Sequence, residues 1–113
     1  MLFVKDLDRM IAFYRDVVGL HLLADTRLEN WAEFAGDGTR FSLHAIPAGI
    51  ATEVPSPPHP REHSNAKFTF AVRNVESTLA QIESMGLPLL HRSWGGTEAV
   101  DPEGNVFALI AGG

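Results

Sequence analysis

The stretches VKDLDRMIAFYRDVVGL (Val4 to Leu20) and VRNVESTLAQIESMGL (Val72 to Leu87) are two versions of one pattern. Each starts with the last residue of a strand-like run, Val4 or Val72, continues through a potential helix cap, Asp6 or Asn74, and ends in Gly-Leu. A short side-chain acceptor at the cap satisfies a free amide of the first turn. Glycine suits the left-handed residue that ends a helix. Each stretch therefore predicts a strand followed by a helix, once in each half of the chain.

The ends of the two halves also match. GTRFSL at 38–43 and GNVFAL at 104–109 share the form Gly-x-x-Phe-small-Leu. Between the helix and this last strand, each half holds two more strand-like runs. They lie near His21 to Leu28 and Asn30 to Ala35, and near Pro88 to Arg92 and Thr97 to Val100. The sequence thus predicts an α+β fold of two tandem βαβββ modules, with eight strands in two mixed sheets of four that curve around a cleft.

The expected organisation is a single domain over residues 1–113. Module one covers 1–46, a proline-rich connector covers 47–65, and module two covers 66–113. The connector holds five of the seven prolines. Proline lacks an amide donor and has a fixed φ, so this segment is expected to be an extended link rather than a helix or central strand. Its histidines, His59 and His63, are interpreted as solvated side chains rather than metal ligands.

Composition excludes several classes of function. The net charge is −5, and the nine Lys and Arg residues are scattered, so no basic patch suggests a nucleic-acid partner. The absence of cysteine excludes disulfides and thiolate metal sites. No apolar run approaches the roughly 18 residues of a membrane span, and the start does not resemble a secretory signal. We expect a cytoplasmic protein with no membrane partner.

Side chains alternate across a strand, so parity divides the strand residues into two faces. One set is apolar and is expected to pack under the helices: Phe41, Leu43, Phe68, Phe70, Val72, Phe107 and Leu109. The other set mixes small, polar and basic residues: Arg40, Ser42, His44, Lys67, Thr69, Ala71, Val106, Ala108 and Ile110. Such a face is unsuited to a core, and it suits a concave surface that holds a ligand.

Two motifs resemble those of a known family. FYRDVVGL (Phe13 to Leu20) resembles the FYxxxLGL helix end, and DPEGNVFAL (Asp101 to Leu109) resembles the DPxGNxxEL close, of the vicinal oxygen chelate superfamily. That superfamily includes glyoxalase I, extradiol dioxygenases, fosfomycin-resistance enzymes and bleomycin-resistance proteins. The resemblance implies the two-module fold and a homodimer, which would also protect the edge of a short first strand. It leaves the function open, because the fold supports many reactions.

The resemblance also allows a test for metal chemistry. Metal-dependent members carry His, Glu or Gln at four strand positions that face the cleft. Three of these positions correspond to Ser42, Lys67 and Ala108, and the fourth would precede Met1. An ammonium cannot coordinate a cation, alanine has no donor, and a lone serine is a poor ligand. The family's metal chemistry is therefore not implied, and we expect no metal and no cofactor.

Lys67 and His44 are the candidate catalytic residues. Lys67 could pair with an anionic substrate or, if desolvated, act as a base or Schiff-base nucleophile. The alternative is a strand-start lysine that reaches water. His44 could donate a hydrogen bond or exchange protons near neutral pH, or it could be structural.

The aromatic and turn residues are also open to two interpretations. Trp31 and Trp94 could form flat walls for a planar ligand, although Trp31 could equally be core. One of His91 and Arg92 must face inward, and the sequence does not say which. The carboxylates of Asp101-Pro102-Glu103-Gly104 are interpreted as part of a turn.

Three functions follow. The leading hypothesis is metal-independent binding of a small aromatic or anionic molecule. Its candidate contacts are Lys67, His44, Ser42, Arg40, Thr69, Trp94, Trp31 and Ala108. The second is a metal-free isomerase or lyase that uses Lys67 and His44. The third is a metal-dependent lyase or dioxygenase with displaced ligands such as His44, His91 and Glu98.

Overall fold

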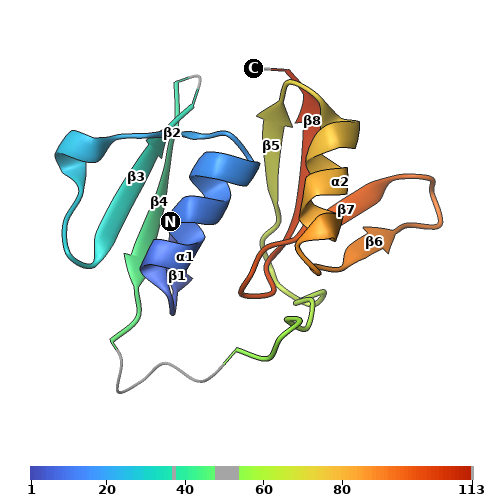
Figure 1. Cartoon of the computed structure of the whole chain (residues 1–113), viewed down its shortest axis with the longest axis horizontal. Helices are drawn as coiled ribbons and strands as arrows, with labels where there is room; N and C mark the ends of the chain where they lie inside the picture. Colours follow the sequence, from blue (N-terminus) through green and yellow to red (C-terminus); the bar gives the residue numbers. More distant parts are fainter. Residues whose placement is uncertain (37, 48–53, 113) are drawn as a thin grey trace. The chain divides into compact units, whose positions relative to one another are not determined.

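The computed structural model describes residues 1–36, 38–47 and 54–112 (Figure 1). The chain divides into two compact units, Met1–Glu53 and Val54–Gly113. Each unit has its own four-stranded sheet. The division falls inside the proline-rich segment, so the second part of that segment belongs to unit 2.

Unit 1 contains β1 (Leu2–Val4), α1 (Leu7–Ala12), the π-helical turn η1 (Phe13–Val17), β2 (His21–Leu22), the 3-10 turn η2 (Ala24–Thr26), β3 (Trp31–Ala35) and β4 (Arg40–Ala45). Its sheet has the order β1-β4-β3-β2, in which β1 runs parallel to β4 and the other pairs are antiparallel. The strand predicted over His21 to Leu28 is wrong beyond Leu22. There the amide and hydroxyl of Thr26 both donate to the carbonyl of Leu23, which closes a turn.

Unit 2 contains β5 (Phe68–Val72), α2 (Val75–Ser84), β6 (Leu89–His91), β7 (Thr97–Val100) and β8 (Val106–Ala111). Its sheet has the order β5-β8-β7-β6, with β5 parallel to β8. This order repeats that of unit 1 strand for strand. The internal repeat and the two mixed sheets of four, predicted from the sequence, are confirmed.

The helix ends form as the sequence predicts. The side chain of Asp6 accepts from the amide of Arg9 at 3.1 Å, and that of Asn74 accepts from the amide of Ser77 at 2.8 Å. Gly19 and Gly86 follow the helices with φ of 85° and 80°, a conformation that favours glycine. These local signals fix where each helix begins and ends.

The predicted apolar face lies on the helix side of each sheet. In unit 1, Tyr14 is fully buried and its ring lies 5.0 Å from that of Phe41. In unit 2, Phe107 is fully buried and its ring lies 5.6 Å from that of Phe70. Phe68 is only half-buried because it starts an edge strand, which has a neighbour on one side only. Phe41 and Leu109 are also half-buried.

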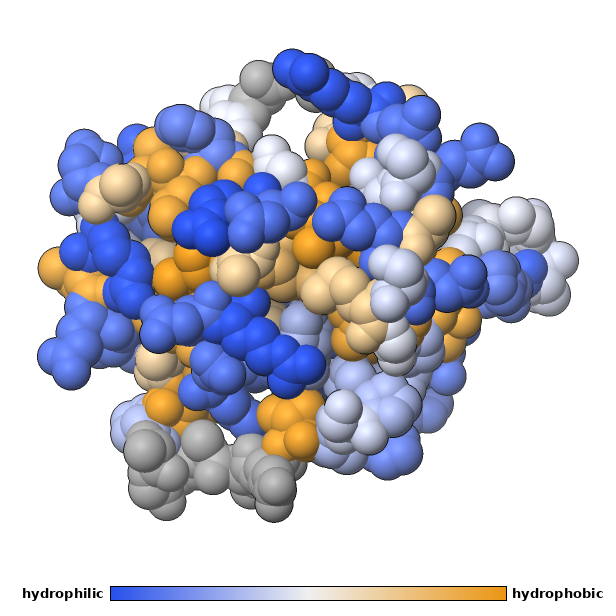
Figure 2. Space-filling model, viewed as in Figure 1, coloured by the Kyte–Doolittle hydropathy of each residue, from blue (hydrophilic) through white to orange (hydrophobic). Residues whose placement is uncertain are grey.

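No helical segment within 1–36, 38–47 and 54–112 is both long enough and apolar enough to cross a bilayer. On the side drawn in Figure 2, hydrophilic residues are interspersed among hydrophobic ones over each unit.

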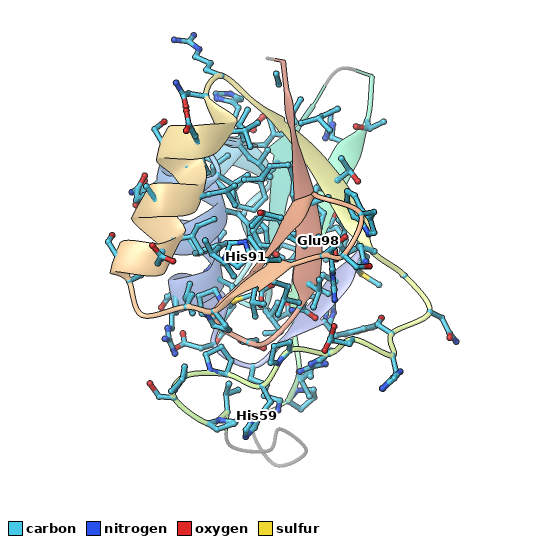
Figure 3. All side chains as sticks on the ribbon, turned by 90° about the vertical axis from the view of Figure 1, so that its right-hand side faces the viewer. His59, His91 and Glu98 are labelled. Atoms are coloured by element: carbon cyan, nitrogen blue, oxygen red, sulfur yellow. The ribbon has the colours of Figure 1, made fainter. Side chains whose placement is uncertain are left out.

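The second part of the proline-rich segment packs on unit 2. Pro58 is buried, and the amide of Arg61 donates to the carbonyl of Gly104 at 2.8 Å. Gly104 has φ of 92°, and a Cβ there would meet the carbonyl oxygen of His59. His59 and His63 are both exposed, and Figure 3 shows His59 on this segment, below the sheet. Residues 54–62 are therefore part of the packed structure of unit 2.

Gly104→Ala is expected to lower the free energy of unfolding by about 2 kcal/mol. The left-handed backbone costs an alanine roughly 1–2 kcal/mol, and the added Cβ meets backbone that cannot move freely. Gly95→Ala is the matched control, because Gly95 has φ of 98° with nothing within 4 Å of its Cβ position. Urea denaturation compares the two variants. Equal losses would mean that the packing of residues 54–62 on Gly104 contributes nothing.

Candidate functional site

The helix-free face of the unit 1 sheet carries a row of three rings. Phe3, His44 and Trp31 are register partners on β1, β4 and β3. The His44 ring lies 5.4 Å from that of Phe3 and 5.9 Å from that of Trp31, and both pairs have edge-to-face geometry. Phe3 is 55% exposed, whereas the other two are half-buried. We call Phe3, His44 and Trp31 the ring row.

Glu33 fixes one end of the ring row. Its carboxylate accepts from Nε1 of Trp31 at 3.1 Å and from Nη1 of Arg40 at 3.1 Å. The hydrogen bond from Trp31, followed by that from Arg40, lowers the pKa of Glu33 below its usual value. Ser42 is the register partner of Glu33 on β4 and is buried. The carboxylate therefore stays ionised at neutral pH and orients the indole.

His44 has a defined tautomer when neutral. Its Nδ1 lies 3.0 Å from the carbonyl oxygen of Ala45, and a carbonyl can only accept. Nδ1 therefore carries the proton, and Nε2 is the acceptor nitrogen. The ring is held at the centre of the ring row by this bond.

In unit 2, a buried carboxylate holds two cations. The Glu98 side chain on β7 is only 6% exposed. Lys67, immediately before β5, donates through Nζ to both Glu98 oxygens, at 3.0 and 2.8 Å. Arg92 donates through Nε to Oε1 of Glu98 at 2.7 Å. Burial alone would raise the pKa of Glu98, but the bonds from Lys67 and Arg92 outweigh it and leave that pKa lowered.

Arg92 also reaches the segment that precedes the sheet. Its Nη1 donates to Oε1 of Glu62 at 2.6 Å. The bond to Glu62 and then the bond to Glu98 raise the pKa of Arg92. We call Glu62, Lys67, Arg92 and Glu98 the Glu98 cluster.

The ring row and the Glu98 cluster occupy related places in the repeat. Glu33 lies opposite Ser42 in unit 1. Continuing the β7–β8 register, in which Ala99 lies opposite Phe107, places Glu98 opposite Ala108 in unit 2. Each unit therefore carries one carboxylate on the third strand of its module, on the helix-free face; Glu33 accepts from Trp31 and Arg40, and Glu98 accepts from Lys67 and Arg92.

The structure separates some residues that the sequence grouped together. His91 lies opposite Thr97 in the β6–β7 register, on the helix side of the sheet, and its Nδ1 is 3.1 Å from the Thr97 hydroxyl. Glu98 is on the other face, as Figure 3 shows. Arg92, rather than His91, thus lies on the face of the unit 2 sheet that carries Glu98. The displaced metal set of the third hypothesis is not brought together, since His91 and Glu98 point to opposite sides.

The remaining candidate ligand contacts lie in unit 2. Thr69 and Ala108 are neighbours on the helix-free face of unit 2, and Lys67 is 47% exposed at the edge of the same face. Trp94 is 73% exposed in the β6–β7 turn, where its ring covers the Gly96 backbone. Within 1–36, 38–47 and 54–112, no three histidine or acidic side chains gather so as to hold a metal ion.

Asp101 has the structural role that the sequence indicated. It is fully buried. Its Oδ1 accepts from the amides of Glu103 and Asn105 at 2.9 and 3.0 Å, and its Oδ2 accepts from the side chain of Asn105 at 2.8 Å. The turn between β7 and β8 is built around this carboxylate.

Sequence reasoning missed three carboxylate partners. Glu98 was considered only as a metal ligand, and Glu33 and Glu62 were not considered. Side-chain alternation could have placed Glu98 on the helix-free face, which is the face of Lys67. Ala99 lies opposite Phe107 on the helix side of the sheet, so its neighbour Glu98 points to the other side. No sequence signal could have paired Glu62 with Arg92, 30 residues away.

Comparison with known proteins identifies the family. The family model of the Glyoxalase/Bleomycin resistance protein/Dioxygenase superfamily matches residues 1–109. The chain belongs to this superfamily. The resemblance found in the two sequence motifs is therefore confirmed, and no curated protein matches the chain.

Solved structures of this superfamily share the fold. A lactoylglutathione lyase from Agrobacterium tumefaciens is 22% identical with a TM-score of 0.62, over 99% of this chain and 90% of that one. A bleomycin resistance determinant encoded on the transposon Tn5 is 22% identical with a TM-score of 0.56, over 97% and 92%. The fosfomycin resistance protein FosX from Mesorhizobium loti is 14% identical with a TM-score of 0.62, over 99% and 87%. At these identities, the likeness concerns the fold alone.

Proposed function

We propose that this protein binds a small planar aromatic molecule on the ring row of unit 1, without a metal ion. The observation that carries the proposal is the alignment of Phe3, His44 and Trp31 on three adjacent strands, on the sheet face opposite the one where Tyr14 packs on Phe41. An aromatic pair contributes about 0.5–1.5 kcal/mol beyond the area it buries. A flat ligand that contacts two or three of these rings therefore gains this contribution once for each ring.

The polar neighbours of the ring row support a binding role. Glu33 holds the indole of Trp31 in place, so little side-chain freedom is lost when a ligand stacks on it. Nε2 of His44 is an acceptor for a ligand hydroxyl or amide. Ser42 and Arg40 lie on the same face of β4 as His44; Ser42 is buried, so Arg40 is the polar side chain of the two that a ligand can reach. The resemblance implies Ser42, Lys67 and Ala108 at the family's metal positions, and these side chains offer at most one weak ligand for a cation, which supports the proposal.

Catalysis by Lys67 is not favoured. The second hypothesis needs a lysine that is available as a base or nucleophile, whereas Lys67 donates to both oxygens of Glu98. The structural neighbours include both a lyase and resistance proteins, so the fold does not choose between catalysis and binding.

Trp31→Leu is expected to weaken binding of planar aromatic probes, such as 2-naphthol, about tenfold, which corresponds to about 1.4 kcal/mol. The protein has two tryptophans, so their indole N–H signals serve as separate reporters in a titration followed by NMR. The Trp31 signal should shift and the Trp94 signal should not, because Trp94 lies in a turn outside the ring row. Trp94→Leu is the matched control, with affinity unchanged within about twofold. Shifts confined to Trp94, or equal losses in both variants, would refute the site.

A further inference from the structure

The Glu98 cluster contains one group that is fixed and one that can be replaced. Glu98 lies within a strand, is buried, and accepts from both cations. Glu62 lies outside the sheet, its side chain is 47% exposed, and it contacts Arg92 through Nη1. An exposed ion pair of this kind contributes only about 0.2–1 kcal/mol. Glu62 can therefore leave Arg92 at little cost, whereas Glu98 cannot.

The two cations lie close together. Nζ of Lys67 and Nε of Arg92 donate to the same oxygen, Oε1 of Glu98, at 3.0 and 2.7 Å. Their separation therefore cannot exceed the sum of these two distances. The Lys67 side chain is 47% exposed, so the pair of cations lies at the border with solvent. A guanidinium and an ammonium at this spacing present several N–H donors to one small anion.

The charges favour such an anion once Glu62 moves. With Glu62 in place, two carboxylates balance Lys67 and Arg92. Without it, the remaining three groups carry one net positive charge, and Nη1 of Arg92 loses its acceptor. Nη1 of Arg92 donates to a carboxylate oxygen of Glu62, so an oxyanion is the kind of acceptor that this group can bind.

We propose that Arg92 and Lys67 form a binding site for a small oxyanion, a carboxylate or phosphate group, which Glu62 occupies as an internal competitor. An arriving anion replaces Glu62 on Nη1 of Arg92, while Glu98 keeps both cations in position. The Arg61–Gly104 hydrogen bond holds the segment against unit 2 during the exchange. The residues of this site belong to unit 2, whereas those of the ring row belong to unit 1, and the proposal does not rest on the ring row.

The test is a titration with sodium phosphate at constant ionic strength, followed through the Nε–H signal of Arg92 by NMR. Glu62→Gln is expected to bind phosphate roughly two- to fivefold more tightly than the wild type, which corresponds to about 0.4–1 kcal/mol. Glu83→Gln removes the same charge from an exposed position on α2 and is the matched control, with affinity unchanged. Adding Lys67→Ala to Glu62→Gln should reverse the gain.

Three results would overturn the proposal. The first is a wild type and a Glu62→Gln variant that both leave the Arg92 signal unmoved by phosphate. The second is an equal gain in Glu62→Gln and Glu83→Gln, which would reflect net charge alone. The third is a gain that survives Lys67→Ala. The amide spectrum of each variant shows whether it is folded, and none of these readouts uses an aromatic ligand.

Discussion

Glu98→Ala is expected to lower the free energy of unfolding by about 2–3 kcal/mol at pH 7. The side chain is buried and accepts three hydrogen bonds from Lys67 and Arg92. Its loss leaves two cations side by side without their shared carboxylate. The figure lies below that of a fully buried pair because Lys67 is half-exposed and can reach water. Urea denaturation measures the change, and a loss below about 0.5 kcal/mol would contradict the role given to Glu98.

The contribution of Glu98 is expected to depend on pH in a defined direction. Its pKa in the folded state is lowered from the ordinary value of 4.5. A group with a lowered pKa stabilises the folded state above its unfolded pKa, and that stability is lost as the pH falls through the folded value. The difference in stability between the wild type and Glu98→Gln should therefore be constant near neutrality and shrink below pH 4.5. A difference that grows in acid would contradict the ion pairs.

Asp101→Ala is expected to lower the free energy of unfolding by about 2–4 kcal/mol. The fully buried carboxylate satisfies two backbone amides and the side-chain amide of Asn105. Alanine would leave these donors without their acceptor in the β7–β8 turn.

Asp101→Asn is the matched control because it keeps an oxygen in place of Oδ1. It should cost less than half as much as the alanine variant in the same denaturation measurement. Equal losses would show that the charge, rather than the acceptor geometry, stabilises the turn.

The parts of the fold that can be predicted from the sequence are those set by local patterns. Alternation and helix caps involve neighbours in sequence, so the repeat, the caps at Asp6 and Asn74 and the two faces of each sheet follow from residue order. The prediction of a strand beyond Leu22 was wrong because a hydrogen-bonded turn at Thr26 competes with strand pairing. Apolar composition alone does not reveal that competition.

The candidate site is less predictable because its contacts join distant residues. Sequence parity placed Lys67 and His44 on the helix-free faces. It could not give Lys67 its partner Glu98, 31 residues away, because that contact depends on the order of strands in the sheet. The ring row likewise requires the parallel register of β1 against β4, which sets Phe3 beside His44.

Binding of a planar molecule on the ring row, without a metal ion, can be tested directly. The most direct measurement is a crystal structure of protein purified without chelators and soaked with 2-naphthol, with anomalous data collected for transition metals. We expect a ligand ring against Trp31 and His44, and no metal peak in either unit. A metal held by nitrogen or oxygen donors at about 2.0–2.6 Å, or a ligand seated away from the ring row, would contradict it.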